Sequence, residues 1–142
     1  MKRLLICLAI FFATAAGAAE TGQHQRVGGI DVYYGIMPAA IAGAHEEKSM
    51  HGGARTGKDR YHLVVALFAA DGQRITEAEV RASVGELGMA SKRVALEPMP
   101  VAGAMSFGNY VALKGRGPFR IAIEILLPGQ ERPLEALFNY RR

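Results

Sequence analysis

The strongest constraint on the fold is an alternation of apolar side chains with a period of two residues. It is clearest in residues 119–127 (FRIAIEILL), where every second residue from Phe119 to Ile125 is apolar. The charged residues Arg120 and Glu124 fall between them. This period is typical of a β-strand that buries one face, whereas an amphipathic helix repeats its apolar residues about every 3.6 positions.

Six further runs, rich in Val, Ile, Leu, Tyr and Phe, have the length or the alternation of strands. Glycine, proline and Asp-Gly turn signals separate them at fairly regular spacing. With residues 119–127, the predicted strands are residues 30–36, 61–69, 80–84, 93–97, 109–113 and 134–140. We expect Pro98 to end the fourth of these strands in chain order. About seven short strands predict an all-β fold, an antiparallel sandwich or a barrel.

The first residues of the chain have the three parts of a secretory signal peptide. Lys2 and Arg3 give a positive start, an apolar run follows, and small residues lead to Ala19. The apolar run is shorter than the roughly 20 residues that a membrane-spanning helix needs. We therefore expect a cleaved signal peptide at residues 1–19, export to the periplasm, and no membrane span in the mature chain.

The remaining residues, 20–142, suffice for a single domain with its own core. We expect its first few residues, His24 among them, to be disordered. Removing the leader deletes two of the 17 Lys and Arg and none of the 13 Asp and Glu, so the formal charge falls from +4 to +2. This small charge, without a basic cluster, argues against nucleic-acid binding.

Cysteine usage limits the chemistry further. The one cysteine, Cys7, lies inside the leader, too early in the apolar run for lipid attachment to be expected. The mature chain then has no disulfide, no thiolate metal ligand and no cysteine nucleophile. No nucleophile elbow, zinc-protease helix or phosphate loop is present, so we do not expect an enzyme.

A long irregular segment, residues 38–59, interrupts the strand pattern. Loops longer than about 12–15 residues are usually functional or disordered. Within it, residues 39–44 have the composition of one helical turn, and Gly52-Gly53 would let the backbone fold tightly around an ion.

Histidine and methionine gather around this loop. His45, Met50 and His51 lie within it, Met37 ends the strand that enters it, and His62 begins the strand that leaves it. Imidazole binds either oxidation state of copper, and thioether is a soft donor for Cu(I). The five residues therefore predict a copper site at one end of the sandwich. The alternative is that the loop histidines are solvated and that His62 lies on an exposed face.

Three more methionines, Met89, Met99 and Met105, lie in or beside turns of the second half of the chain. Methionine most often fills irregular gaps in a core, so we interpret these three as packing residues rather than ligands.

Residues 61–127 resemble small bacterial envelope domains of the YtkA/FixH type. The stretch HLVVALFAADGQRITEAEVRASV follows their pattern of an apolar strand, a D-G turn and I-x-x-A-x-V, and GNYVALKGRGPFRIAIEI follows their glycine- and aromatic-marked close. The matching positions are Asp71, Gly72, Ile75, Ala78, Val80, Gly108, Tyr110, Gly117 and Phe119. LGMASKRVALEPM looks like the methionine-containing loop of the family.

This resemblance implies an immunoglobulin-like sandwich with an accessory role in metal handling or in the maturation of metal-bearing complexes. Copper-resistance proteins of the CopC type are a more distant likeness. We therefore expect a periplasmic protein that binds or delivers copper, with a metal-transport complex or another envelope protein as partner. The alternative is a metal-free interaction module that recruits a partner through its loop or an exposed edge strand.

Overall fold

Strands make up almost all of the regular structure in a computed structural model, which describes residues 22–42 and 57–142. The strands within these ranges are β1 (His24–Val27), β2 (Ile30–Pro38), β3 (Arg60–Phe68), β4 (Glu79–Glu86), β5 (Lys92–Val101), β6 (Ala104–Ala112), β7 (Phe119–Leu126) and β8 (Leu134–Tyr140). A single helical turn, α1 (Ala39–Ala42), follows β2. The all-β prediction is confirmed, with eight strands in place of about seven.

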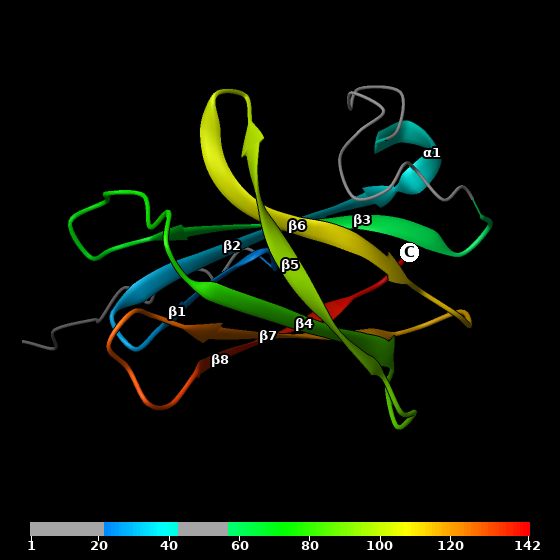
Figure 1. Cartoon of the computed structure of the whole chain (residues 1–142). Coiled ribbons are helices and arrows are strands. Elements are labelled where there is room, and N and C mark those ends of the chain that lie inside the picture. The colour runs from blue at the N-terminus through cyan, green and yellow to red at the C-terminus, as the bar shows by residue number, and fades with distance from the viewer. Residues whose placement is uncertain (1–21, 43–56) are drawn as a thin grey trace, which may run out of the picture.

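All eight strands belong to one antiparallel sheet, in the order β1-β2-β3-β6-β5-β4-β7-β8. β5 joins its two halves, because residues 92–96 pair with β4 and residues 97–101 pair with β6. The sheet therefore folds over into two facing layers (Figure 1). β1 and β8 also approach each other, and the Leu137 N–H donates a hydrogen bond to Gln25 Oε1 at 2.8 Å. This arrangement confirms the predicted antiparallel sandwich.

The main core lies between the two layers. In β7 the alternation is fully realised, since every second side chain from Phe119 to Ile125 is completely buried. On the other layer, every second residue of β3 is also buried in this core, namely Leu63, Val65 and Leu67. Each fully buried side chain of this size contributes about 1.5–3 kcal/mol relative to an exposed one. The apolar alternation therefore determines which face of each strand turns inward.

The expected disorder around His24 is wrong, because this residue begins β1. Gly28 and Gly29, with φ angles of 53° and 82°, form a two-residue turn between β1 and β2. Positive φ at both central positions is the geometry of a tight hairpin turn, which glycine adopts without steric cost. The strand is short and polar, so its own alternation is weak, but the Gly-Gly pair was a hairpin signal.

The predicted end of a strand at Pro98 is also wrong, because β5 continues to Val101. Its second half pairs only with β6, which leaves its other edge without a neighbouring strand. Proline lacks the N–H that a central strand must donate, but an edge position tolerates it. Pro98 and Pro100 therefore fit here. β6 likewise begins earlier than predicted, at Ala104.

The predicted helical turn in residues 39–44 is confirmed for Ala39–Ala42. It packs against β2 and β3. Within residues 22–42 and 57–142, no helix is both long enough and apolar enough to cross a membrane.

Candidate metal centre

Two of the five predicted ligands are neighbours in the structure. Met37 on β2 and His62 on β3 are directly opposite each other in the antiparallel register, so their side chains share one face of the sheet. This is the outer face, because Tyr61 and Leu63 on either side of His62 belong to the main core. The other three predicted ligands, His45, Met50 and His51, lie outside the described residues.

His62 is buried although it points away from the main core. Only 2% of its surface is exposed, so the alternative that it lies on an exposed face is wrong. Its ring lies 5.0 Å from that of Tyr110, its cross-strand partner on β6. Outside the main core, the buried residues among those described are Ala39, Ala42, His62, Met99, Ser106, Gly108 and Tyr110. The outer face therefore carries buried groups of its own.

Gly108 brings an imidazole and a thioether together on this face. A Cβ atom at this position would lie 3.2 Å from His62 Nε2 and would overlap Met99 Sδ. Both donor atoms therefore border the space that a side chain at residue 108 would occupy. We call His62, Met99 and Gly108 the Gly108 site.

A carboxylate lies next to the Gly108 site. Glu97 on β5 is the register partner of Gly108, so its side chain projects from the same outer face. Ser106, the register partner of Met99, is engaged elsewhere, because its Oγ accepts a hydrogen bond of 3.1 Å from Arg74 Nη1. Within the described residues no group of three or more His, Cys, Asp or Glu forms a metal cluster.

The interpretation of all three later methionines as core fillers is wrong in part. Met99 is buried, but it packs beside His62 on the outer face rather than in the main core. Met89 is 69% exposed in the turn between β4 and β5. Met105 precedes Ser106 on β6, so it projects toward the opposite side of the sheet. Recognising Met99 from sequence required knowing that β5 continues past Pro98.

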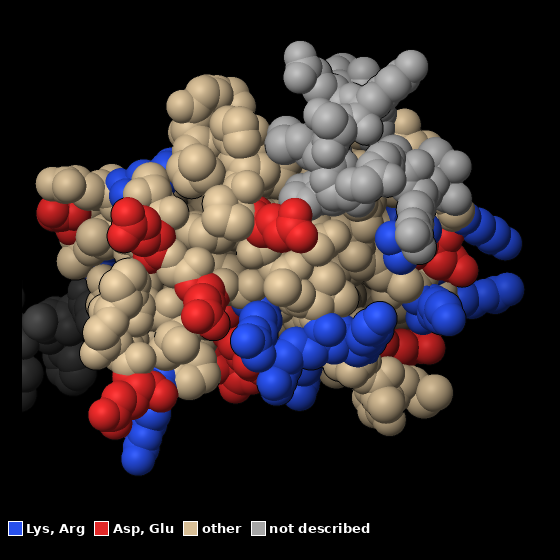
Figure 2. Space-filling view, in the orientation of Figure 1, with Lys and Arg blue, Asp and Glu red and all other residues tan. Residues whose placement is uncertain are grey.

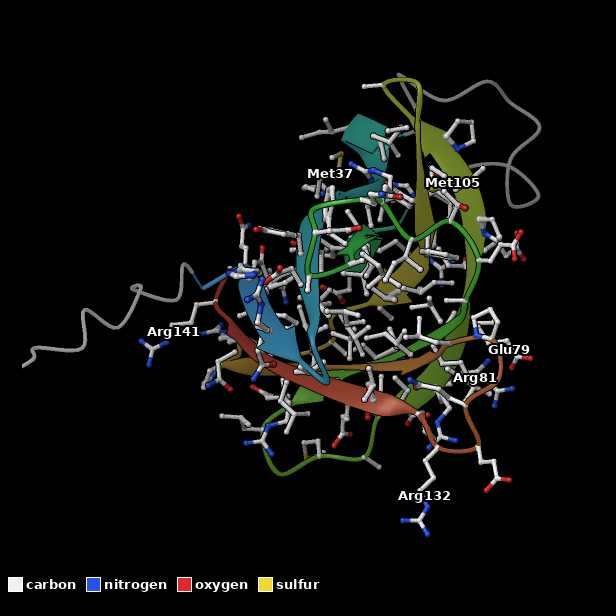
Figure 3. The ribbon with its side chains drawn as sticks, turned by 90° about the vertical axis from the view of Figure 1, so that its left-hand side faces the viewer. Met37, Glu79, Arg81, Met105, Arg132 and Arg141 are labelled. Atoms are coloured by element: carbon white, nitrogen blue, oxygen red, sulfur yellow. The ribbon has the colours of Figure 1, made fainter. Side chains whose placement is uncertain are left out.

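The two labelled methionines of Figure 3, Met37 and Met105, lie toward the end of the molecule that carries α1 and the β5–β6 turn. Glu79, Arg81 and Arg132 lie toward the opposite end. This separation makes the latter residues suitable remote controls for substitutions on the outer face.

His24 belongs to a different cluster. Its Nε2 lies 2.8 Å from Asp31 Oδ1, and its ring stacks on Tyr33 with centroids 4.3 Å apart. Arg26 donates to both oxygens of the same carboxylate. The hydrogen bonds from Arg26 and then from His24 lower the pKa of Asp31 to about 2. These contacts attach β1 to β2 and account for His24 without a metal.

Neither a protein-family model nor a curated protein sequence matches the chain. Solved structures do. A DUF4426 family protein from Pseudomonas aeruginosa matches with a TM-score of 0.57 and 21% identity, over 84% of this chain and 96% of that one. Copper-reconstituted P19 from Campylobacter jejuni matches with a TM-score of 0.66 and 14% identity, over 84% and 92%.

A copper-bound variant of FetP from a uropathogenic Escherichia coli strain matches with a TM-score of 0.67 and 10% identity, over 84% of this chain and 93% of that one. The likeness to YtkA and FixH domains stays a prediction. At these identities the comparisons establish the fold, which the chain shares with a DUF4426 family protein and with copper-bound P19 and FetP.

Proposed function

We propose that the protein is a periplasmic metal-handling protein that binds copper at the Gly108 site. The observation that carries the proposal is the convergence of His62 Nε2 and Met99 Sδ on the space above Gly108. The donor set fits copper, since thioether is a soft ligand for Cu(I) and imidazole serves both oxidation states. Glu97 adds a carboxylate on the same face, and Met37 a second thioether beside His62.

The burial of the two donors suits metal retention and transfer. His62 and Met99 are 2% and 3% exposed, so their surroundings exclude most water. A neutral imidazole and a neutral thioether carry no charge whose burial would be costly, unlike a carboxylate. A bound copper ion would add positive charge to this face. Glu97, the cross-strand partner of Gly108, would place a negative charge beside it.

Two further observations support the proposal. The fold is that of P19 and FetP, which have been obtained as copper-bound structures. Residues 1–19 have the pattern of a secretory leader, which would place the protein in the periplasm. His45, Met50 and His51 remain predicted ligands that would add to the same centre, and a metal-transport complex of the envelope is the proposed partner. We propose a role in binding and delivery rather than catalysis.

The rival hypothesis of a metal-free module that binds by strand addition has less support. β1 and β8, the end strands of the sheet, contact each other, as the Gln25–Leu137 hydrogen bond shows. The open edge of β5 carries Pro98 and Pro100, and proline on an edge hinders pairing with another chain.

Copper titration of the secreted chain tests the proposal. Cu(I) affinity is measured by competition with a coloured chelator, and Cu(II) affinity by calorimetry. We expect His62→Gln and Met99→Leu each to weaken binding about tenfold or more, at least the loss that follows when only an outer-shell partner of a ligand is changed. Met99→Leu is a volume-conserving change and costs less than about 1.5 kcal/mol of stability.

Met89→Leu is the matched control. Met89 precedes the opposite end of β5, and the seven residue steps from Lys92 to Met99 alone span about 23 Å. Binding that is weaker than micromolar, or that neither His62→Gln nor Met99→Leu changes, would contradict the Gly108 site. If only a His45→Ala/His51→Ala double variant abolishes binding, the copper function stands and the site lies in residues 43–56.

A further inference from the structure

A second candidate site lies where β5 and β6 separate. The two strands pair between residues 97–101 and 104–108. Beyond Gly108, β6 stays with β3, while residues 92–96 of β5 pair with β4. A pocket of about 680 Å³ occupies the gap between the diverging strands, a volume typical of small-molecule sites. We call it the wedge pocket.

The wedge pocket has a positive lining. Arg60, Lys92 and Lys114 contribute three cationic side chains, against the single carboxylate of Glu86. Glu86 Oε1 already accepts a hydrogen bond of 3.1 Å from the Gly117 N–H. None of the three cations has an ion-pair partner in the part of the chain that the structure describes. Figure 2 shows Lys and Arg gathered in a band over β4 and β5 on this side of the molecule.

Arg60 supplies a specific hydrogen-bond donor. Its Nε atom is buried and has no hydrogen-bond acceptor among the described residues. A buried donor without an acceptor is unfavourable, and nearly all such groups in folded proteins are paired. Arg60 also lines the wedge pocket, where its guanidinium can form a charge-assisted hydrogen bond to an anionic ligand, which is stronger than a neutral one.

The deeper wall of the pocket is apolar. Val84 and Val111 are buried residues of the main core, and Val94 is half-buried beside them. We propose that the wedge pocket binds a small organic anion, a carboxylate with a short apolar body. The carboxylate lies at Arg60 with Lys92 and Lys114 around it, and the apolar body lies along the three valines. This site is separate from the Gly108 site and does not depend on copper.

The test is an NMR titration of ¹⁵N-labelled protein at low ionic strength with three probes. Hexanoate carries both the carboxylate and the apolar body, hexylamine reverses the charge on the same body, and inorganic phosphate carries the charge alone. We expect saturable shifts with hexanoate, centred on residues 92–94 and 110–112. Hexylamine or phosphate binding as tightly as hexanoate would overturn the proposal, as would the absence of saturable hexanoate binding.

Substitutions locate the site. Arg60→Gln should weaken hexanoate binding about tenfold or more, the effect of losing a hydrogen bond to a charged group. Should Arg60→Gln fail to fold, the double variant Lys92→Gln/Lys114→Gln, which changes only the remaining cations of the pocket, carries the test. Arg132→Gln is the charge-matched control, since Arg132 is exposed and is not among the residues that line the wedge pocket. Equal losses in Arg132→Gln, or unchanged binding in the folded pocket variants, would overturn the proposal.

Discussion

At the scale of single residues, Gly108 determines what the outer face can hold. Gly108 lies in a cross-strand row with Gly35, Val64 and Glu97. Its two direct partners, Val64 on β3 and Glu97 on β5, both carry side chains beyond Cβ. The missing side chain leaves room for His62 Nε2 and Met99 Sδ to approach the backbone. A glycine in a strand interior often marks such a close approach.

Gly108→Ala should remove this space. We expect a loss of about 1–3 kcal/mol in the free energy of unfolding, the usual cost of overpacking, together with weaker copper binding. Leu63 O, 3.2 Å from the added Cβ, is backbone and has little freedom to move away. Urea denaturation and the copper competition assay measure the two effects.

Gly35→Ala is the control for this prediction. Gly35 lies in the same row, opposite Val64, but a Cβ there would have no atom within 4 Å. The substitution should leave copper binding unchanged and stability unchanged or slightly higher, because alanine has less backbone freedom than glycine to lose on folding. A Gly108→Ala variant that behaves like Gly35→Ala would show that the donors do not use this space.

At the scale of elements, the attachment of β1 depends on one carboxylate. Asp31 on β2 accepts hydrogen bonds from Arg26 and lies 2.8 Å from the His24 imidazole, both on β1. These bonds lower the pKa of Asp31 from 3.8 to about 2. A lowered pKa means that the stabilisation is complete above pH 4 and is lost as the pH falls toward 2.

Asp31→Asn should therefore lower the free energy of unfolding at neutral pH and change its acid dependence. The difference in free energy of unfolding between the native protein and the variant should narrow as the pH falls from about 4 to about 2. Over this range Asp31 becomes protonated in the folded state as well as in the unfolded state. Urea denaturation at a series of pH values measures this difference. A difference that stays constant over this range would contradict the assignment.

The elements also show how far the sequence could be interpreted. Apolar runs and alternation predicted the seven longer strands, because each buries one face in the main core. They missed β1, since His24 to Val27 is short and polar and is held by side-chain contacts and the Gly28-Gly29 turn. The predicted end of β5 at Pro98 was too early. Proline interrupts a central strand but is tolerated on an edge, and the sequence alone does not show which position Pro98 occupies.

The candidate sites were harder to predict for a related reason. Met37 and His62 could be grouped because they flank one loop in sequence. Met99, Glu97 and Gly108 join His62 only through the β3–β6 and β5–β6 pairings, which connect distant parts of the chain. Such register information is not contained in local patterns.

At the scale of the whole molecule, Arg142 connects parts of the chain that are far apart in sequence. Its guanidinium donates to Asp59 Oδ1 and to Leu113 O, each at 3.2 Å, and to Gly115 O. It also lies over the rings of Tyr61 and Phe119. The hydrogen bond to Tyr61, followed by that to Asp59, raises the pKa of Arg142.

Arg142→Ala should lower the melting temperature by several degrees, because it removes these bonds from the segment before β3 and from the β6–β7 loop. Arg141→Ala is the matched control, since Arg141 is exposed and forms no hydrogen bond or ion pair with the described residues (Figure 3). Differential scanning calorimetry compares the two. Equal shifts would indicate a general charge effect rather than this set of contacts.

On β3 and β6, odd-numbered residues face the main core and even-numbered residues face outward, toward the proposed copper site. Leu63, Val65 and Phe107 are odd-numbered and build the interior, while His62 and Gly108 are even-numbered and face outward. Substitutions at even positions could therefore alter the ligand preference of the proposed copper centre without repacking the interior, so that centre could change independently of the scaffold. A one-residue insertion in either strand would exchange the two sets, turning His62 or Gly108 toward the interior and core residues outward. The scaffold thus tolerates changes of side chain at the centre far better than changes of strand length.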